Sequence, residues 1–206
     1  MAFRHPSTLS PLALVVLALL DEAPMYPYRM QQLIRERGND QLVNIRNRAS
    51  LYQTITRLDR DGLIEVQGVA KTEHRPERTT YQLTELGRTT LHSWLREMLG
   101  TRAAEFPEFP VALSFVYLLE PEVALEELTR RRAALEAAQL RLAGMLAEHS
   151  GAVPRLFLLE SEYLNAIAEA ELAWLRGIAA DLGTGRLGWN TAAIRAQYAD
   201  TGESGS

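Results

Sequence analysis

The fold of this chain is decided by one stretch, Ala49-Ser50-Leu51-Tyr52-Gln53-Thr54-Ile55-Thr56-Arg57-Leu58-Asp59-Arg60-Asp61-Gly62-Leu63-Ile64. Leu51, Ile55 and Leu58 follow one another by four and three positions, which places them on one face of a helix. Gly62 can adopt the positive φ that ends many helices, and the β-prone run that begins at Leu63 follows at once. The stretch therefore predicts a short amphipathic helix that leads directly into a strand.

The other face of this helix carries polar side chains of the kinds that contact DNA. A Gln can pair bidentately with adenine, Ser and Thr can bond to either base edge, and Arg and Tyr can contact phosphates. The residues concerned are Arg48, Ser50, Tyr52, Gln53, Thr54 and Arg57. A merely solvated helix face has a similar composition, and Arg57 could instead pair with Asp61 four positions on. The place of the helix in the chain decides between these interpretations.

Two helices are expected before this stretch. Ser10-Pro11 suits the N-cap and first position of a helix, and the apolar run from Leu12 to Leu20 predicts that this helix is buried on most sides. Pro24 ends it. A second helix is expected over Tyr28–Arg37, closed by the Gly-Asn-Asp sequence at 38–40.

A β-hairpin and a further helix are expected after it. Leu63–Val69 predicts one strand, Val69–Glu77 a polar loop, Arg78–Leu83 the returning strand, and Thr84 the start of a helix through Leu99. The order is that of a winged helix-turn-helix, in which the third helix enters the major groove and the wing lies on the backbone. The wing residues that could reach phosphate or the minor groove are Lys71, His74, Arg75 and Arg78.

The second half predicts long helices. After a Pro-rich connector at 106–110 and a short helix over Val111–Leu119, apolar residues recur by threes and fours over Pro121–His149 and again over Arg155–Leu182. Two long helices packed as an antiparallel pair bury only part of their apolar surface, so a homodimer through residues 121–182 is expected. The predicted fold class is mainly α with a small β-wing. The predicted domains are a winged helix-turn-helix at 1–100, a helical dimerisation and effector-response domain at 101–198 and a flexible tail at 199–206.

Composition narrows the class of protein. Residues 1–100 carry 13 Lys and Arg against 11 Asp and Glu, whereas residues 101–206 carry 9 against 15, so a mildly basic front precedes an acidic back. The absence of Cys excludes disulfides, thiolate zinc sites and Cys nucleophiles. The apolar run at 12–20 is too short to span a bilayer, and Asp21 follows it in place of a signal-peptide cleavage site. We expect a cytoplasmic protein without a membrane partner.

Two other classes of function compete with DNA binding. His5, His74, His92 and His149 are scattered without metal-ligand spacing, and the chain has neither a Gly-rich phosphate loop nor a Gly-x-Ser-x-Gly motif. We therefore expect no catalysis, no metal and no cofactor. The net charge of −4 favours the second alternative, a helical protein-interaction adaptor whose winged domain does not bind DNA. Loss of the charges at Arg57 and Arg75 would weaken DNA binding but leave an adaptor unaffected.

Aromatic residues on the later helices raise the question of an effector. A pocket for a small aromatic ligand near the domain junction would involve Trp94 and Trp174. Aromatic residues at helical spacing more often belong to a core or a dimer interface, so packing is the favoured interpretation for both.

Residues 9–99 resemble the PadR-like family of transcriptional regulators. The matching pieces are Leu9-Ser10-Pro11-Leu12-Ala13-Leu14, Pro24-Met25-Tyr26-Pro27-Tyr28, the stretch from Ser50 to Ile64, and Arg78-Thr79-Thr80-Tyr81-Gln82-Leu83-Thr84-Glu85-Leu86-Gly87. The resemblance implies a dimeric repressor that binds a near-palindromic double-stranded DNA operator and is released by a small molecule. It also implies that Tyr52 and the residues around Ser50 touch DNA. One departure is Tyr26-Pro27-Tyr28, where the family usually has His-Gly-Tyr.

Overall fold

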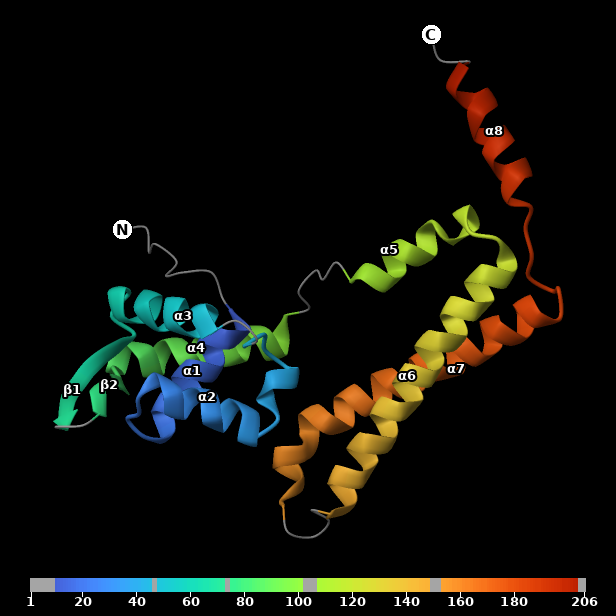
Figure 1. The fold of residues 1–206 in the computed structure, drawn as a ribbon. Coiled ribbons are helices and arrows are strands. Elements are labelled where there is room, and N and C mark those ends of the chain that lie inside the picture. Colours follow the sequence, from blue (N-terminus) through green and yellow to red (C-terminus); the bar gives the residue numbers. More distant parts are fainter. Residues whose placement is uncertain (1–9, 46–47, 73–74, 102–106, 149–152, 204–206) are drawn as a thin grey trace. The chain divides into compact units, whose positions relative to one another are not determined.

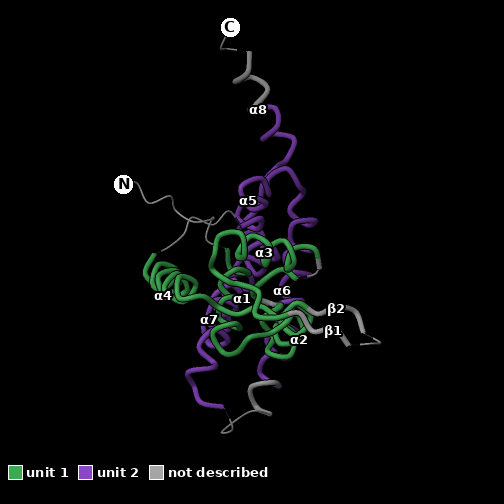
Figure 2. The backbone as a smooth tube through the Cα atoms, turned by 90° about the vertical axis from the view of Figure 1, so that its left-hand side faces the viewer, with its two compact units in different colours: residues 1–105 green, residues 106–206 purple. Residues whose placement is uncertain are grey.

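The computed structural model describes residues 10–45, 48–72, 75–101, 107–148 and 153–203 of the chain. It divides into two compact units, residues 1–105 and residues 106–206 (Figure 2). The described elements are helices and one two-stranded sheet, which confirms the predicted fold class.

The first unit contains the predicted series of helices and strands (Figure 1). Its elements are α1 (Pro11–Glu22), α2 (Pro27–Glu36), the 3-10 turn η1 (Asn39–Gln41), α3 (Arg48–Arg60), β1 (Ile64–Thr72), β2 (Arg75–Leu83) and α4 (Glu85–Gly100). The order of three helices, two strands and a helix is that of a winged helix-turn-helix.

Helix α1 is the centre of the first unit. It contacts α2, α3, α4 and β2, and its Ala13, Val16 and Leu17 are fully buried. The apolar stripe of α3 packs into the same core, where Leu58 is 0% exposed and Leu51 is 1% exposed. A helix that is apolar nearly all round is therefore surrounded by the other elements, as its sequence predicts.

The connection between α1 and α2 explains the departure at Tyr26-Pro27-Tyr28. Tyr26 is extended and precedes α2, and Pro27 occupies the first turn, where its missing N–H would have no helical partner. The guanidinium of Arg37, just after α2, donates to both carboxylate oxygens of Glu22 at 2.5 and 2.8 Å. This hydrogen bonding lowers the pKa of Glu22. The pair ties the two helix ends together across the Pro-containing turn.

The wing is longer than its sequence suggests. The antiparallel pairing of β1 and β2 runs from Ile64 opposite Leu83 to Thr72 opposite Arg75, with irregularities near Gln67 and Lys71. The predicted loop at 69–77 is therefore wrong in extent, because most of it is strand. Strand pairing uses backbone groups, so polar side chains do not end it. An isolated bridge between Met25 and Tyr81 attaches the wing to the α1–α2 connection.

The end of α3 is joined to both the wing and α4. Gly62 has a φ of 72°, as expected for a residue that ends a helix. Its N–H donates to the Asp59 carbonyl at 2.9 Å, and the Leu63 N–H donates to the Leu58 carbonyl at 2.9 Å, which is a Schellman motif. The Thr84 hydroxyl donates to the carbonyls of Gly62 at 2.8 Å and Leu63 at 3.0 Å and accepts from the Gly87 N–H at 3.0 Å.

The second unit is helical in its described part. Its elements are α5 (Glu108–Ser114), η2 (Val116–Leu118), α6 (Pro121–Glu148), η3 (Arg155–Leu158), α7 (Leu159–Gly183) and α8 (Thr191–Glu203). The long helices α6 and α7 run antiparallel (Figure 1) and are joined by ion pairs between Arg131 and Glu171 and between Arg176 and Glu136. No helix in the described part of the chain is both long enough and apolar enough to cross a membrane.

The C-terminal region differs from the sequence-based expectation. Helix α8 continues to Glu203, past the start of the tail predicted at residue 199, and residues 204–206 lie outside the described part. Trp189 and Thr191, just before and at its start, donate to the carbonyl of Leu119 at 2.8 and 3.2 Å. These bonds hold the beginning of α8 against the end of η2, a contact between distant parts of the sequence that periodicity does not reveal.

Gly87→Ala should destabilise the first unit. A Cβ at this position would collide with the carbonyl oxygen of Leu63 and lie 2.7 Å from Cδ1 of Leu83. We expect the substitution to lower the free energy of unfolding by about 1–3 kcal/mol, because the backbone atoms it meets cannot move aside freely. Chemical denaturation measures this. Gly100→Ala, in the same helix with nothing within 4 Å, is the control and should change it by less than about 0.5 kcal/mol. Equal effects of the two substitutions would contradict the close contact.

Candidate nucleic-acid interface

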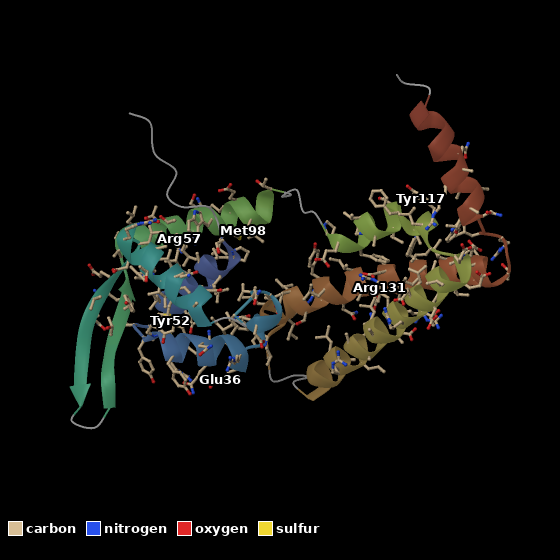
Figure 3. The ribbon with its side chains drawn as sticks, turned by 45° about the horizontal axis from the view of Figure 1, so that its top comes forward. Glu36, Tyr52, Arg57, Met98, Tyr117 and Arg131 are labelled. Carbon is tan, nitrogen blue, oxygen red and sulfur yellow. The ribbon has the colours of Figure 1, made fainter. Side chains whose placement is uncertain are left out.

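Helix α3 presents a continuous polar face to solvent. Tyr52 is 53% exposed (Figure 3), and the other exposed side chains of this face are Gln53, Thr56, Asp59 and Arg60. The buried stripe on the opposite side anchors the helix in the core, so these five side chains are held outward by a rigid support. This exposed face of α3 has the form that major-groove recognition requires.

Two of the residues predicted to contact bases lie differently from expectation. Thr54 is only 8% exposed, and its hydroxyl donates to the Ser50 carbonyl at 2.8 Å within the helix. Ser50 is half-buried. The placement of Thr54 does not suit contact with a base edge, whereas Gln53 is exposed as expected.

Thr56 and Arg60 were missed by the sequence analysis. The Thr56 hydroxyl donates to the Tyr52 carbonyl at 3.0 Å, so its methyl group and oxygen lie beside Tyr52 on the outer face. The signal was present, because Tyr52, Thr56 and Arg60 follow one another by four positions, opposite the apolar stripe. The exposed stripe therefore continues one turn further than the predicted contact residues.

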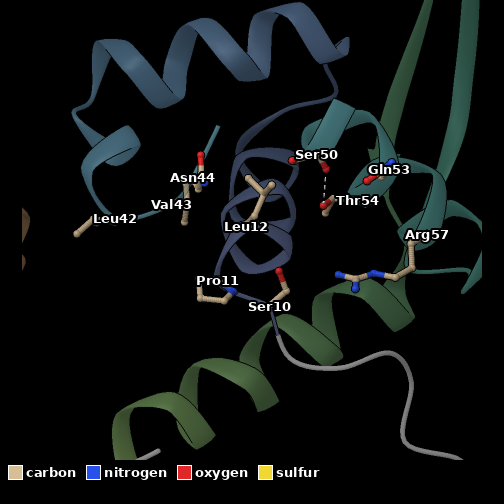
Figure 4. A pocket seen from close by; sticks show the side chains of 10 residues that line it. All are labelled: Ser10, Pro11, Leu12, Leu42, Val43, Asn44, Ser50, Gln53, Thr54 and Arg57. Atoms are coloured by element: carbon tan, nitrogen blue, oxygen red, sulfur yellow. Dashed lines mark hydrogen bonds between the residues drawn. The ribbon is translucent and has the colours of Figure 1, made fainter. Parts of the chain in front are cut away.

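Arg57 does not form the expected pair within its helix. Asp61 instead accepts from the Nε of Arg60 at 3.0 Å. The Nε of Arg57 and the Oδ2 of Asp61 are both buried without a hydrogen-bond partner, and in the described part of the chain Arg57 takes part in no ion pair. Its side chain is half-buried, and its guanidinium lies along one flank of α3 rather than on the exposed face (Figure 4).

A surface pocket of about 470 Å³ opens on that flank. It lies between the start of α1, the segment at 42–44 after η1, and α3 (Figure 4). We call it the flank pocket, and its lining residues are Ser10, Pro11, Leu12, Leu42, Val43, Asn44, Ser50, Gln53, Thr54 and Arg57. Four of the six residues of α3 and its lead-in that the sequence analysis singled out therefore meet in one place.

The opposite flank of α3 faces the wing. The pKa of the Tyr81 phenol on β2 is raised, chiefly by burial and further by the nearby Asp59 carboxylate and Tyr52 phenol. Tyr81 thus lies close to two residues of α3, while its backbone pairs with Met25. Helix α3 also contacts β1, so the wing and α3 are neighbours in the first unit.

The predicted cations of the wing have known strand positions but undescribed side chains. Lys71 lies on β1, and Arg75 and Arg78 lie on β2 opposite Thr72 and Ala70. His74 lies outside the described residues, and the side chain of Arg48, the first residue of α3, is not described. Their proposed roles stay predictions.

The two tryptophans considered for an effector lie in different units. Trp94 is 6% exposed and belongs to the core of the first unit. Trp174 meets Phe109 edge to face, with ring centroids 6.0 Å apart, and the guanidinium carbon of Arg131 lies 3.6 Å from the centroid of Phe109. Packing accounts for Trp94, whereas Trp174 is 42% exposed and its role in ligand binding stays a prediction. Among the described residues, no group of three His, Asp or Glu side chains is placed to hold a metal ion.

Comparison with known proteins relates most of the first unit to one family. Residues 16–93 match the model of the transcriptional regulator PadR-like family. The sequence matches none of the curated proteins with which it was compared.

Solved structures share the fold of most of the chain. Bacillus subtilis PadR in complex with operator DNA has 21% identity and a TM-score of 0.67, with 84% of this chain and 99% of that chain covered. The same protein in complex with p-coumaric acid has 20% identity and a TM-score of 0.65, with 84% and 98% covered. The virulence activator AphA of Vibrio cholerae has 16% identity and a TM-score of 0.63, again with 84% and 98% covered. At these identities the likeness establishes the fold.

Proposed function

We propose that this chain is a dimeric DNA-binding repressor that a small molecule releases from its operator, because residues 16–93 match the model of the PadR-like family of transcriptional regulators. A place in the cytoplasm, with access to DNA, is part of the proposal. The observation that carries it is the exposed face of α3, which the core holds outward beside the wing.

The residues of α3 take distinct roles in this proposal. Gln53 reads a base edge by a bidentate contact, and Thr56 adds a shorter contact further along the helix. Arg60 contacts phosphate, and the Tyr52 hydroxyl donates to a phosphate oxygen at the edge of the groove. Thr54 is left out because its side chain is buried, with only 8% of its surface exposed, whereas Thr56 is exposed.

The uneven charge of the chain is compatible with an anionic partner. The exposed face of α3 needs only a few cations at phosphate distance, and the wing adds Lys71, Arg75 and Arg78 at strand positions toward its tip. The acidic second half contributes negative charge that is screened beyond about 10 Å at 0.1 M salt. A basic surface can therefore act on DNA although the chain has a net charge of −4.

The small-molecule release draws support from a structural neighbour. Bacillus subtilis PadR, which shares the fold, has been seen both with operator DNA and with p-coumaric acid. A family of transcriptional regulators also gives no support to catalysis, so we propose that the chain is not an enzyme. The adaptor is the alternative, and DNA-binding measurements decide between them.

Gln53→Ala should weaken binding to a specific operator. Footprinting on DNA upstream of the chain's own gene provides that operator, and a titration measures the affinity. The loss of a bidentate base contact should cost about 1–3 kcal/mol and relax preference at one base pair. Gln197→Ala, in α8 of the second unit, is the control and should leave affinity unchanged. If Gln53→Ala preserves both affinity and base preference, Gln53 does not read a base.

Arg60→Gln should reduce the salt dependence of DNA binding. The slope of log affinity against log salt should fall by about one contact, because one cation no longer displaces counterions. Arg186→Gln is a matched control: both arginine side chains are 71% exposed and pair with an aspartate. An adaptor would show no specific DNA binding with any of these proteins, and equal slopes for the two variants would remove Arg60 from the interface.

The chain should be a homodimer through α6 and α7. Leu159, Tyr163 and Ile167 follow one another by four positions on α7, and each is at least 47% exposed. Sedimentation at micromolar concentration should show a dimer, and its footprint should contain two half-sites about one helical turn apart. Ile167→Glu should yield monomers, because it places a charge within an apolar contact. Leu187→Glu, outside this stripe, should remain dimeric. A monomeric unmodified chain would refute the assembly.

A further inference from the structure

We propose that Asp61 is a positioning residue of the DNA-binding surface. It holds the guanidinium of Arg60 in the free chain, and it turns to the Nε–H of Arg57 when Arg60 contacts a phosphate. The phosphate step rests on the function proposed above, whereas the exchange of Asp61 between two arginines does not. All three residues lie at or just after the end of α3, within the first unit.

Two buried atoms at the end of α3 lack hydrogen-bond partners. They are the Nε of Arg57, which is a donor, and the Oδ2 of Asp61, which is an acceptor. An unpaired donor or acceptor shielded from water is costly, and more so when it belongs to a charged group. Each atom is the kind of partner that the other lacks, so one charge-assisted hydrogen bond between them would satisfy both.

The backbone places these two residues one helical turn apart. The N–H of Asp61 donates to the carbonyl of Arg57 at 3.0 Å, so the pair has the spacing of four positions at which Arg and Asp side chains can meet. The side chain of Asp61 is only 16% exposed, and Arg57 is half-buried. A rotation of the two side chains would therefore bring Oδ2 to Nε without any movement of the helix.

In the free chain Asp61 is bound to a different arginine. Its Oδ1 accepts from the Nε of Arg60 at 3.0 Å and lies 3.0 Å from Nη2 of the same guanidinium. The side chain of Arg60 is 71% exposed, and an ion pair so open to water contributes little stability. A phosphate, which also gains from the release of counterions, can therefore displace Asp61 from Arg60.

The end of α3 makes an unpaired Asp61 unfavourable. The last carbonyl groups of a helix carry partial negative charge, and the basic residues of this last turn are Arg57 and Arg60. When Arg60 moves to a phosphate, Asp61 loses the cation that balances its charge beside the helix end. Arg57 takes the place of Arg60, and the two unpaired buried atoms become partners in the same step.

The exchange gives Arg57 an indirect role in DNA binding. Its guanidinium lies along a flank of α3 and not on the exposed face (Figure 4). In the complex, its bond to Asp61 keeps that carboxylate from recapturing Arg60. Arg57 should therefore support operator affinity without contacting a phosphate itself.

NMR of the arginine Nε–H groups in the full chain tests the exchange. A carboxylate partner moves such a signal downfield, and Arg57→Gln identifies the signal by its loss. Arg60→Ala removes the present partner of Asp61, so the Arg57 signal should move downfield in the free chain, and adding Asp61→Asn should cancel this movement. Arg186→Ala, which breaks an exposed pair with Asp181, is the matched control and should leave the Arg57 signal in place.

Operator DNA tests the phosphate step. The operator should move the Arg57 signal downfield in the unmodified chain but not in Asp61→Asn, which keeps the size of the side chain. Arg57→Gln should weaken operator binding by about threefold or more without lowering the salt slope, because Arg57 acts through Asp61. In an Asp61→Asn background the same substitution should have little effect.

Several outcomes would overturn the proposal. If Asp61→Asn alone moves the Arg57 signal in the free chain, the two residues are partners already, and if Arg60→Ala leaves that signal in place, no exchange takes place. If Arg57→Gln lowers the salt slope with and without Asp61→Asn, Arg57 is a direct phosphate contact. If no DNA is bound at all, the proposed function and the phosphate step fail, while Arg60→Ala in the free chain still decides the exchange.

Discussion

The winged unit depends on one small junction at the end of α3. Gly62 closes the helix in a left-handed conformation, and the Thr84 hydroxyl then bonds to the carbonyls of Gly62 and Leu63 while it caps α4. The absence of a side chain at Gly87 lets α4 approach the Leu63 carbonyl. Helix α3, the wing and α4 are thus joined to one another at this junction. A shift there would move the exposed face of α3 relative to the wing, and in the proposed function both meet the same duplex.

The two flanks of α3 are built differently. On one side Tyr52 and Asp59 lie near Tyr81, whose strand is in turn bonded to Met25, so that flank is supported by the wing. On the other side the flank pocket leaves Arg57 without a partner.

In the second unit, buried apolar residues hold the long helices together, while other apolar residues of the same helices are exposed. Leu172 and Leu175 are buried between the long helices, and ion pairs such as that of Arg176 with Glu136 cross the same interface. Exposed pairs of this kind contribute little stability, so the apolar contacts hold the helices together. The apolar stripe from Leu159 to Ile167 remains uncovered within one chain, and large apolar surfaces of this kind usually mark a contact with another molecule.

The sequence by itself determined the helices, the wing and the orientation of α3, because these follow from local patterns. Leu51, Ile55 and Leu58 repeat with the helical period, Gly62 stops the helix, and Pro27 starts α2. The same period also places Tyr52, Thr56 and Arg60 on the outer face, although only Tyr52 is among the predicted DNA contacts.

Only the tertiary structure decided which polar residues of α3 are free to act. Thr54 is removed from the surface by the core beneath it, and Arg57 is directed into a space formed by segments at 10–12 and 42–44 that are distant in sequence. The wing was underestimated because strand pairing joins backbones and ignores the polar side chains that suggested a loop. Helical periodicity gives the direction of a side chain, but what meets it there depends on how the rest of the chain packs.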